Sequence, residues 1–274
     1  MERLLFAAYP AADAQPDDRF GLLVGCRSAP VQRAAVALDA TVPMIEAAAA
    51  AGCQLLVTHH PPYWFAPEDF IASPSAASSG GAAVFAAAAA GVALIAVHTC
   101  LDCAPSAAGM LLDPVGLQYV RPLRSDLLGQ LARPAGGCQE LSLEELAGAY
   151  RDAFGAVAKV WGEPQKRLHT IAVCSGGAGE VIPDVLAAGA DCFVTGEVRH
   201  HEALYLSDEG IALIELSHDI SELPYRQYLR ETLIKAGIAA DDVVVLSPSA
   251  CWWAPAGSAR HSDQRTTDEE AVSI

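Results

Sequence analysis

The sequence predicts an α/β fold made of two similar three-layer domains. Short apolar runs of strand length alternate with alanine-rich segments of helical length, which favours parallel strands joined by crossover helices. Residues 51–58 (AGCQLLVT) also resemble residues 188–195 (AGADCFVT) at an offset of 137 residues. An internal duplication would explain this similarity, and chance likeness between alanine-rich units is the alternative. Duplication would let two related domains face each other across a cleft that holds a ligand site.

Turn and cap residues define the elements of the first half. Thr41 can cap a helix that has Pro43 in its first turn and is stopped by Gly52. The loop at residues 61–81 is long, and its aromatic residues Trp64 and Phe65 can either wall a pocket or pack on the core. The expected strands are 21–25, 34–38, 55–58, 92–97, 117–120 and 127–132, and the expected helices are 41–51, 82–90 and a short one after Pro105.

The second half repeats this alternation. Ser142 and Glu145 have the spacing of a capping box, which predicts a helix that runs to Phe154. The further elements are strands at 170–174, 191–195, 211–216 and 243–246, with helices that end at Gly189 or span 199–207 and 221–235. We place the first domain at residues 1–125 and the second at 126–250, and we expect a disordered tail at 251–274 because it is polar and lacks apolar periodicity.

Composition limits the possible partners. The 274 residues carry a formal net charge of -16, which argues against binding to a nucleic-acid backbone but leaves room for a phosphorylated small molecule. The apolar run at 82–97 is interrupted by Gly91 and is short for a membrane span. Eight scattered cysteines without a secretory signal favour a reducing, cytoplasmic setting. We therefore expect a small-molecule substrate, with no nucleic acid and no membrane as partner.

Four apolar strands end in imidazoles or carboxylates, and this pattern is the main functional signal. Ligands bind at the carboxyl ends of strands in open α/β sheets, and these side chains suit divalent zinc, manganese, iron or nickel. A single histidine after a strand is usually structural, but four such endings together favour a site. The residues that follow the four strands are His59 and His60; His98 and Asp102; Glu197 with His200 and His201; and His218 and Glu222.

Five of these side chains are candidate metal ligands. One ion with an open coordination position would leave some of them unused, whereas two ions with a bridging carboxylate would use all five: His59, His60, Asp102, His218 and Glu222. A pair of cations can hold a bridging hydroxide, which is a nucleophile for hydrolysis. His98 and Glu197 are the preferred proton carriers, with a purely structural role as the alternative.

Two weaker motifs have structural alternatives. Cys100 and Cys103 have CxxC spacing, but no second CxxC exists, so incidental cysteines are favoured over a redox pair or a zinc half-site. The glycine-rich loop from Ser175 to Gly179 precedes a helix and can bind an anion, although a tight turn is the simpler interpretation.

Together these residues resemble the Nif-three-like family of dinuclear-metal proteins, often labelled GTP cyclohydrolase I type 2. The resemblance spans roughly residues 21–229 and implies a dinuclear site with Glu222 as the bridge, two similar α/β domains and a toroidal homohexamer. Ser217 stands where the family usually has glycine. The matching motifs are residues 36–41 (VALDAT), 58–61 (THHP), 98–102 (HTCLD) and 195–197 (TGE), with His201, His218 and Glu222.

Two functions remain in competition at this point. The first is a dinuclear-metal-dependent hydrolase that acts on a small polar, nucleotide-like or amide-containing substrate. The second is a metal-binding regulatory or scaffold protein without turnover. A CxxC redox protein is a third possibility, and it requires function to depend on Cys100 rather than on metal.

Overall fold

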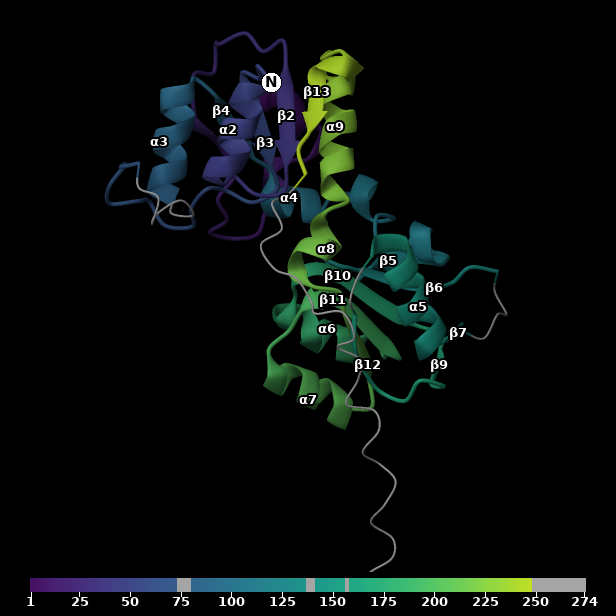
Figure 1. Ribbon diagram of the computed structural model, residues 1–274. Helices are drawn as coiled ribbons and strands as arrows, with labels where there is room; N and C mark the ends of the chain where they lie inside the picture. The colour runs from purple at the N-terminus through teal and green to yellow at the C-terminus, as the bar shows by residue number, and fades with distance from the viewer. Residues whose placement is uncertain (73–79, 137–140, 156–157, 248–274) are drawn as a thin grey trace, which may run out of the picture.

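The computed structural model describes residues 1–72, 80–136, 141–155 and 158–247. It has two α/β domains, each built around its own sheet, with the short helices α4 (His98–Asp102) and α8 (His218–Glu222) where the domains meet (Figure 1). The expected α/β class is therefore confirmed. Within the described residues, no helix is long and apolar enough to cross a membrane.

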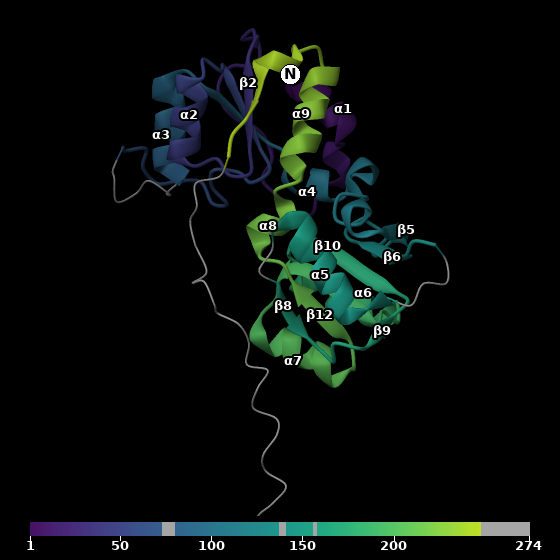
Figure 2. The same ribbon diagram turned by 45° about the vertical axis from the view of Figure 1, so that its right-hand side comes forward.

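The first sheet has five strands, of which four run parallel. Only the edge strand β1 is antiparallel to its neighbour. Helices α2 (Val42–Ala50) and α3 (Gly80–Ala90) cover one face, while α1 (Glu2–Ala8) and α9 (Tyr225–Lys235) lie on the other (Figure 2). The strand order is β1 (Gly21–Val24), β4 (Ala93–Ala96), β3 (Leu55–Thr58), β2 (Ala34–Ala37) and β13 (Val243–Val245).

The second sheet has six strands around a parallel centre. Its order is β5 (Leu117–Pro122), β6 (Gln130–Pro134), β10 (Ile171–Gly177), β11 (Cys192–Glu197), β12 (Ala212–Glu215) and β8 (Lys159–Trp161). The predicted capping box of Ser142 and Glu145 is present at the start of α5. The remaining elements are α5 (Leu143–Phe154), α6 (Ile182–Ala187), α7 (His200–Asp208) and the short pair β7 (Leu141–Ser142) and β9 (Arg167–Leu168).

Alternating side chains produce three layers in each domain. Along β11, Cys192 and Val194 join the same core cluster as Leu143 of α5, whereas Phe193 joins the cluster that contains Val185 of α6. Successive residues of a strand point to opposite faces, so both faces of the sheet must be covered. The first sheet is built the same way, and one cluster of buried residues continues from it into the second domain.

The structure places the two similar segments in equivalent positions. Strands β3 and β11 begin 137 residues apart, and each pairs in parallel with the strand that precedes it in its own unit. Strands β4 and β12 are each followed by a five-residue helix, α4 or α8, which begins with histidine and ends with a carboxylate residue. The carboxyl ends of both parallel sheets therefore carry the same types of side chain.

Sheet membership divides the chain differently from the expected boundary at residue 125. Strand β5 already belongs to the second sheet, and β13 returns to the first sheet beside β2. The helix α9 makes this return possible, because it packs on the first sheet rather than on the second. The expected tail at 251–274 lies outside the described residues.

Two of the differences from the expected elements have a clear physical cause. The helix expected at 221–235 is two helices, α8 and α9, with Pro224 between them, because proline lacks the N–H that would continue α8. The strand expected at 127–132 begins only at Gln130, because Leu127 and Gly129 have φ of 73° and 69° and form a turn.

Candidate metal centre

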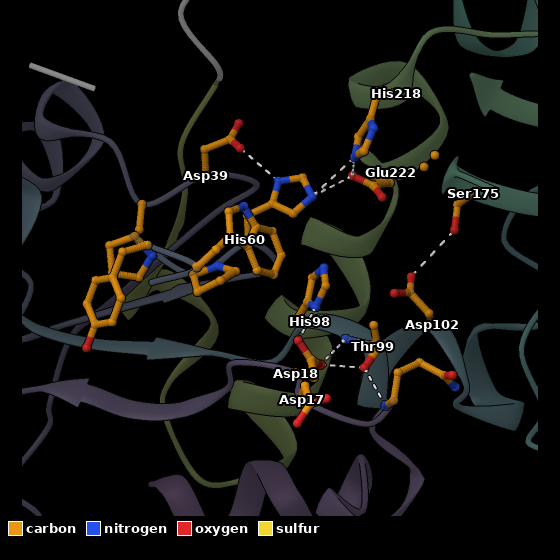
Figure 3. Close-up of a pocket in the computed structure, with 18 of the residues that line it drawn as sticks. Asp17, Asp18, Asp39, His60, His98, Thr99, Asp102, Ser175, His218 and Glu222 are labelled. Atoms are coloured by element: carbon orange, nitrogen blue, oxygen red, sulfur yellow. Dashed lines mark hydrogen bonds and ion pairs between the residues drawn. The ribbon is translucent and has the colours of Figure 1, made fainter. Parts of the chain in front are cut away.

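The structure brings the five expected ligands together at the junction of the two domains. His59 and His60 follow β3, Asp102 ends α4, and His218 and Glu222 begin and end α8. Four of them, His60, Asp102, His218 and Glu222, line a cleft of about 880 Å³ whose walls come from both domains (Figure 3). Three groups of these side chains have ligand atoms within 4.8 Å of one another: His59, Asp102 and Glu222; His60, His218 and Glu222; and His59, His60 and His98.

His59 is the deepest member of the site. It is fully buried, and neither ring nitrogen has a hydrogen-bond partner. Its Nε2 lies 3.7 Å from Asp102 Oδ1 and 3.6 Å from Glu222 Oε1, and the ring of Tyr225 stacks on the imidazole with centroids 4.6 Å apart. A buried imidazole without a partner is costly, so this arrangement fits a cation between His59 and the two carboxylates.

His60 and His218 converge on the other oxygen of Glu222. Glu222 Oε2 lies 3.0 Å from His60 Nε2 and 3.3 Å from His218 Nε2, and the two nitrogens are 3.4 Å apart. Although the separations are short, Glu222 Oε2 has no partner with hydrogen-bond geometry. The three atoms therefore converge on one position, as ligands of one ion do, and the two imidazole nitrogens also lie within hydrogen-bonding geometry of each other.

Each of three histidines has a carboxylate on its Nδ1. Asp39 Oδ1 lies 2.8 Å from Nδ1 of His60, Glu197 Oε1 lies 3.0 Å from that of His218, and Asp18 Oδ1 lies 2.6 Å from that of His98. Such a carboxylate accepts a hydrogen bond from Nδ1 and directs Nε2 toward the site, which is the usual arrangement around metal-binding histidines. Glu197, expected as a proton carrier, thus lies against His218.

The carboxylates alter the proton affinities of these groups. Burial would lower the pKa of His60, but attraction to Asp39 and Glu222 outweighs it and raises that pKa to about 10. The hydrogen bond to Glu222 raises the pKa of His218 to about 9. Although burial opposes the change, the nearby imidazoles hold the pKa of Glu222 well below its usual value. The excess negative charge that favours protons here would equally favour divalent cations.

Two glycines let β10 and β11 approach the site. A Cβ on Gly176, whose φ is +66°, would lie 2.4 Å from Glu222 Oε1, and one on Gly196 would lie 2.7 Å from Ser221 Oγ. The N–H of Gly176 donates to Ser221 Oγ over 2.9 Å, and Ser221 in turn donates to the carbonyl of His218. The loop from Ser175 to Gly179 thus braces α8, and at least this N–H is not free for an anion.

Ser217 carries backbone strain immediately before α8. Its φ and ψ are 81° and 142°, a region that favours glycine. We expect Ser217→Gly to raise the free energy of unfolding by about 1 kcal/mol, because the relieved strain exceeds the added entropy of the unfolded chain. Chemical denaturation of the metal-free protein measures this. Ser207→Gly, at an ordinary helical position of α7, should instead destabilise the protein, and a fall for both variants would refute the account.

Asp18 lies at this site but was not among the residues expected there. Its side chain is 2% exposed, and its second oxygen accepts hydrogen bonds from the N–H and the hydroxyl of Thr99. Burial would raise the pKa of Asp18, but the bonds from His98 and Thr99 lower it to about 2. Nothing in the irregular acidic segment around Asp18 distinguished it from a solvated aspartate. Tyr225 was missed because an aromatic residue that begins a helix usually packs in the core.

Other expected residues lie elsewhere. His200 and His201 are exposed on α7, where the ring of His200 lies 5.8 Å from that of Trp161. Cys100 and Cys103 are buried, and burial raises the pKa of each thiol to about 12. Thiols that stay protonated at neutral pH are poor nucleophiles, which argues against a CxxC redox pair.

A sequence model of the Duf34/NIF3 (NGG1p interacting factor 3) family matches residues 1–247. A curated relative from Streptomyces coelicolor, named GTP cyclohydrolase 1 type 2 homolog, is 34% identical over 145 residues, which is 49% of this chain and 50% of the relative. The chain thus spans about half the length of the curated relatives it matches.

Solved structures share the fold. A hypothetical protein from Staphylococcus aureus has a TM-score of 0.79 at 22% identity, and the match covers 90% of this chain and 95% of the Staphylococcus aureus chain. A Bacillus cereus protein related to NIF3 has a TM-score of 0.76 at 16% identity, and the match covers 89% of this chain and 94% of the Bacillus cereus chain. At these identities, the likeness concerns the fold alone.

Proposed function

The chain belongs to the Duf34/NIF3 family, and from this premise and the site geometry we propose that it is a dinuclear-metal-dependent hydrolase of small polar molecules. The observation that carries the proposal is the carboxylate of Glu222, whose two oxygens face two separate groups of ligands. The adjoining cleft of about 880 Å³ offers room for a substrate, which a purely structural metal site does not need.

His59, Asp102 and Glu222 would hold one divalent ion, and His60, His218 and Glu222 the other. Zinc, manganese, iron and nickel all suit these ligands. When bound, the ions would lower the pKa of a water molecule at the site and polarise the bond under attack. The carboxylates of Asp39 and Glu197 orient the two histidines on the solvent side of the site.

His98 is the proposed proton carrier. Its Nδ1–H donates to Asp18, which leaves Nε2 as the open ring nitrogen, and a ring nitrogen of His98 lies within 4.8 Å of nitrogens of His59 and His60. Nε2 would take a proton from the attacking water and return it to the leaving group, so that water is added across the cleaved bond. Asp18 positions this imidazole and stabilises its protonated form.

The affinity for metal should rise with pH. In the metal-free protein His60 and His218 hold protons, with pKa values of about 10 and 9, and an ion that binds both Nε2 atoms must displace them. The two Nε2 atoms lie 3.4 Å apart, so the two protonated imidazoles repel each other. We therefore expect metal binding at pH 7 to release at least one proton per protein. Calorimetry in buffers of different ionisation enthalpy counts these protons. Binding without proton release would contradict the assignment.

The function is tested on purified protein of known metal content. Turnover of cyclic amides, nucleotides or phosphoesters should require metal and should fall by at least about 100-fold in His98→Gln, while the metal content stays unchanged. Strong metal binding without turnover on the whole panel would instead favour a regulatory or scaffold protein. We also propose a homohexamer, and light scattering that gives a monomer would exclude it.

A further inference from the structure

The charge of the cleft restricts the substrate class. Among the residues that the structure describes, no lysine or arginine lines the cleft, whereas six carboxylates do. Two divalent ions would bring four positive charges, which still leaves the lining negative. The acidic residues are Asp17, Asp18, Asp39, Asp102, Glu180 and Glu222.

Two arginines adjoin residues of the lining: Arg19 follows Asp18 in sequence, and Arg124 pairs with Glu180. Arg124 has Nη2 2.6 Å from Asp126 and Nη1 3.5 Å from Glu180, so its charge is shared between two acids. Arg19 donates through Nε to the carbonyl of Trp64 over 3.1 Å, and its guanidinium lies over the ring of Tyr63. A triphosphate needs several free cations or donors beyond its metal ion, and neither arginine is among the residues that line the cleft.

One wall of the cleft is apolar and aromatic. Tyr63, Trp64 and Phe65 line it, and the ring of Trp64 stands edge-on to that of His98 with centroids 4.8 Å apart. The side chains of Trp64 and Phe65 remain 53% and 88% exposed. Exposed aromatic rings beside a polar centre suit a flat apolar group of a ligand, and they also attract cations.

We propose that this cleft takes a neutral or positively charged small molecule with a flat apolar group and no phosphate chain. Within the proposed hydrolase function, on which this inference rests, the substrate is then an amide rather than a nucleotide. The amide oxygen would lie at the end of the cleft lined by Asp102 and Glu222, and the flat group would lie against Trp64.

The test uses two matched pairs of probes on the zinc-loaded full-length protein at physiological ionic strength. Tryptamine and indole-3-propionate are alike in shape and opposite in charge, and guanosine and GTP share a base. We expect calorimetry to show at least about tenfold tighter binding of tryptamine than of indole-3-propionate, and of guanosine than of GTP. Equal or reversed preferences, or no binding of any probe, would overturn the proposal.

A charge reversal within the cleft provides the matched variant. Glu180→Lys should bring the affinity for GTP up by about tenfold, whereas Glu209→Lys, an equal charge change at the exposed end of α7, should not. Equal effects of both variants on GTP affinity would show that this affinity depends on the net charge of the protein and not on the charge of the cleft. Metal content is measured on the same samples: protein that binds none of zinc, manganese, iron or nickel refutes the proposed function, whereas zinc-loaded protein that prefers GTP refutes only the substrate class.

Discussion

Glu222→Gln is expected to abolish binding of both metal ions. The two oxygens of this carboxylate face different ligand groups, with His59 Nε2 3.6 Å from Oε1 and His60 Nε2 3.0 Å from Oε2. Glutamine keeps the shape but removes the charge and one lone-pair-rich oxygen, so both positions lose a ligand at once. We expect the apparent affinity for each ion to fall by more than about 100-fold, so that elemental analysis after dialysis finds essentially no metal.

The matched control for this prediction is Glu231→Gln. Glu231 lies on α9, nine residues beyond Glu222, and is exposed. Glu231→Gln changes the net charge of the protein by the same amount as Glu222→Gln, but it should leave the metal content unaltered. Retention of one ion in Glu222→Gln would show that the carboxylate serves a single position, and retention of both would show that it is not a ligand.

Gly176→Ala is expected to have the second largest effect. The added Cβ would lie 2.4 Å from Glu222 Oε1, so the carboxylate must leave the position in which it now faces His59. Since the shared carboxylate would be displaced without any change in charge, we expect a loss of affinity for both ions on the order of 10–100-fold. Isothermal titration of the metal-free variant measures this loss.

Gly189→Ala separates backbone strain from displacement of the carboxylate. Gly189 has φ of +64°, close to the +66° of Gly176, but nothing lies within 4 Å of the added Cβ. Both variants should lose about 1 kcal/mol of stability from the left-handed conformation, and only Gly176→Ala should lose metal. Equal metal binding by the two variants would contradict the close packing of β10 on Glu222.

The fold could be predicted because its signals are local in sequence. Apolar strands such as Leu55–Thr58 and the capping box at Ser142 can be recognised from a few consecutive residues. The return of β13 to the first sheet could not be predicted, since Val243–Val245 looks the same whichever sheet it joins. Pro224 could have been recognised as the break between α8 and α9, because proline interrupts the helical hydrogen bonds.

The candidate site was partly predictable for the same reason. Imidazoles and carboxylates near strand ends can be recognised as candidate metal ligands from their residue type, and His59, Asp102 and Glu222 were identified in this way. Asp18 was not, because its role depends on a contact with His98, 80 residues away. The role of Glu197 also depended on such a contact, and its position beside His218 Nδ1 now favours orientation of a ligand over proton transfer.

The most direct test of the dinuclear centre is a crystal structure of metal-loaded protein with data collected on either side of the metal's absorption edge. The anomalous difference map should show two peaks roughly 3.5–4 Å apart, one between His59, Asp102 and Glu222 and the other between His60, His218 and Glu222. A single peak at this junction, or metal bound only elsewhere in the molecule, would contradict the account.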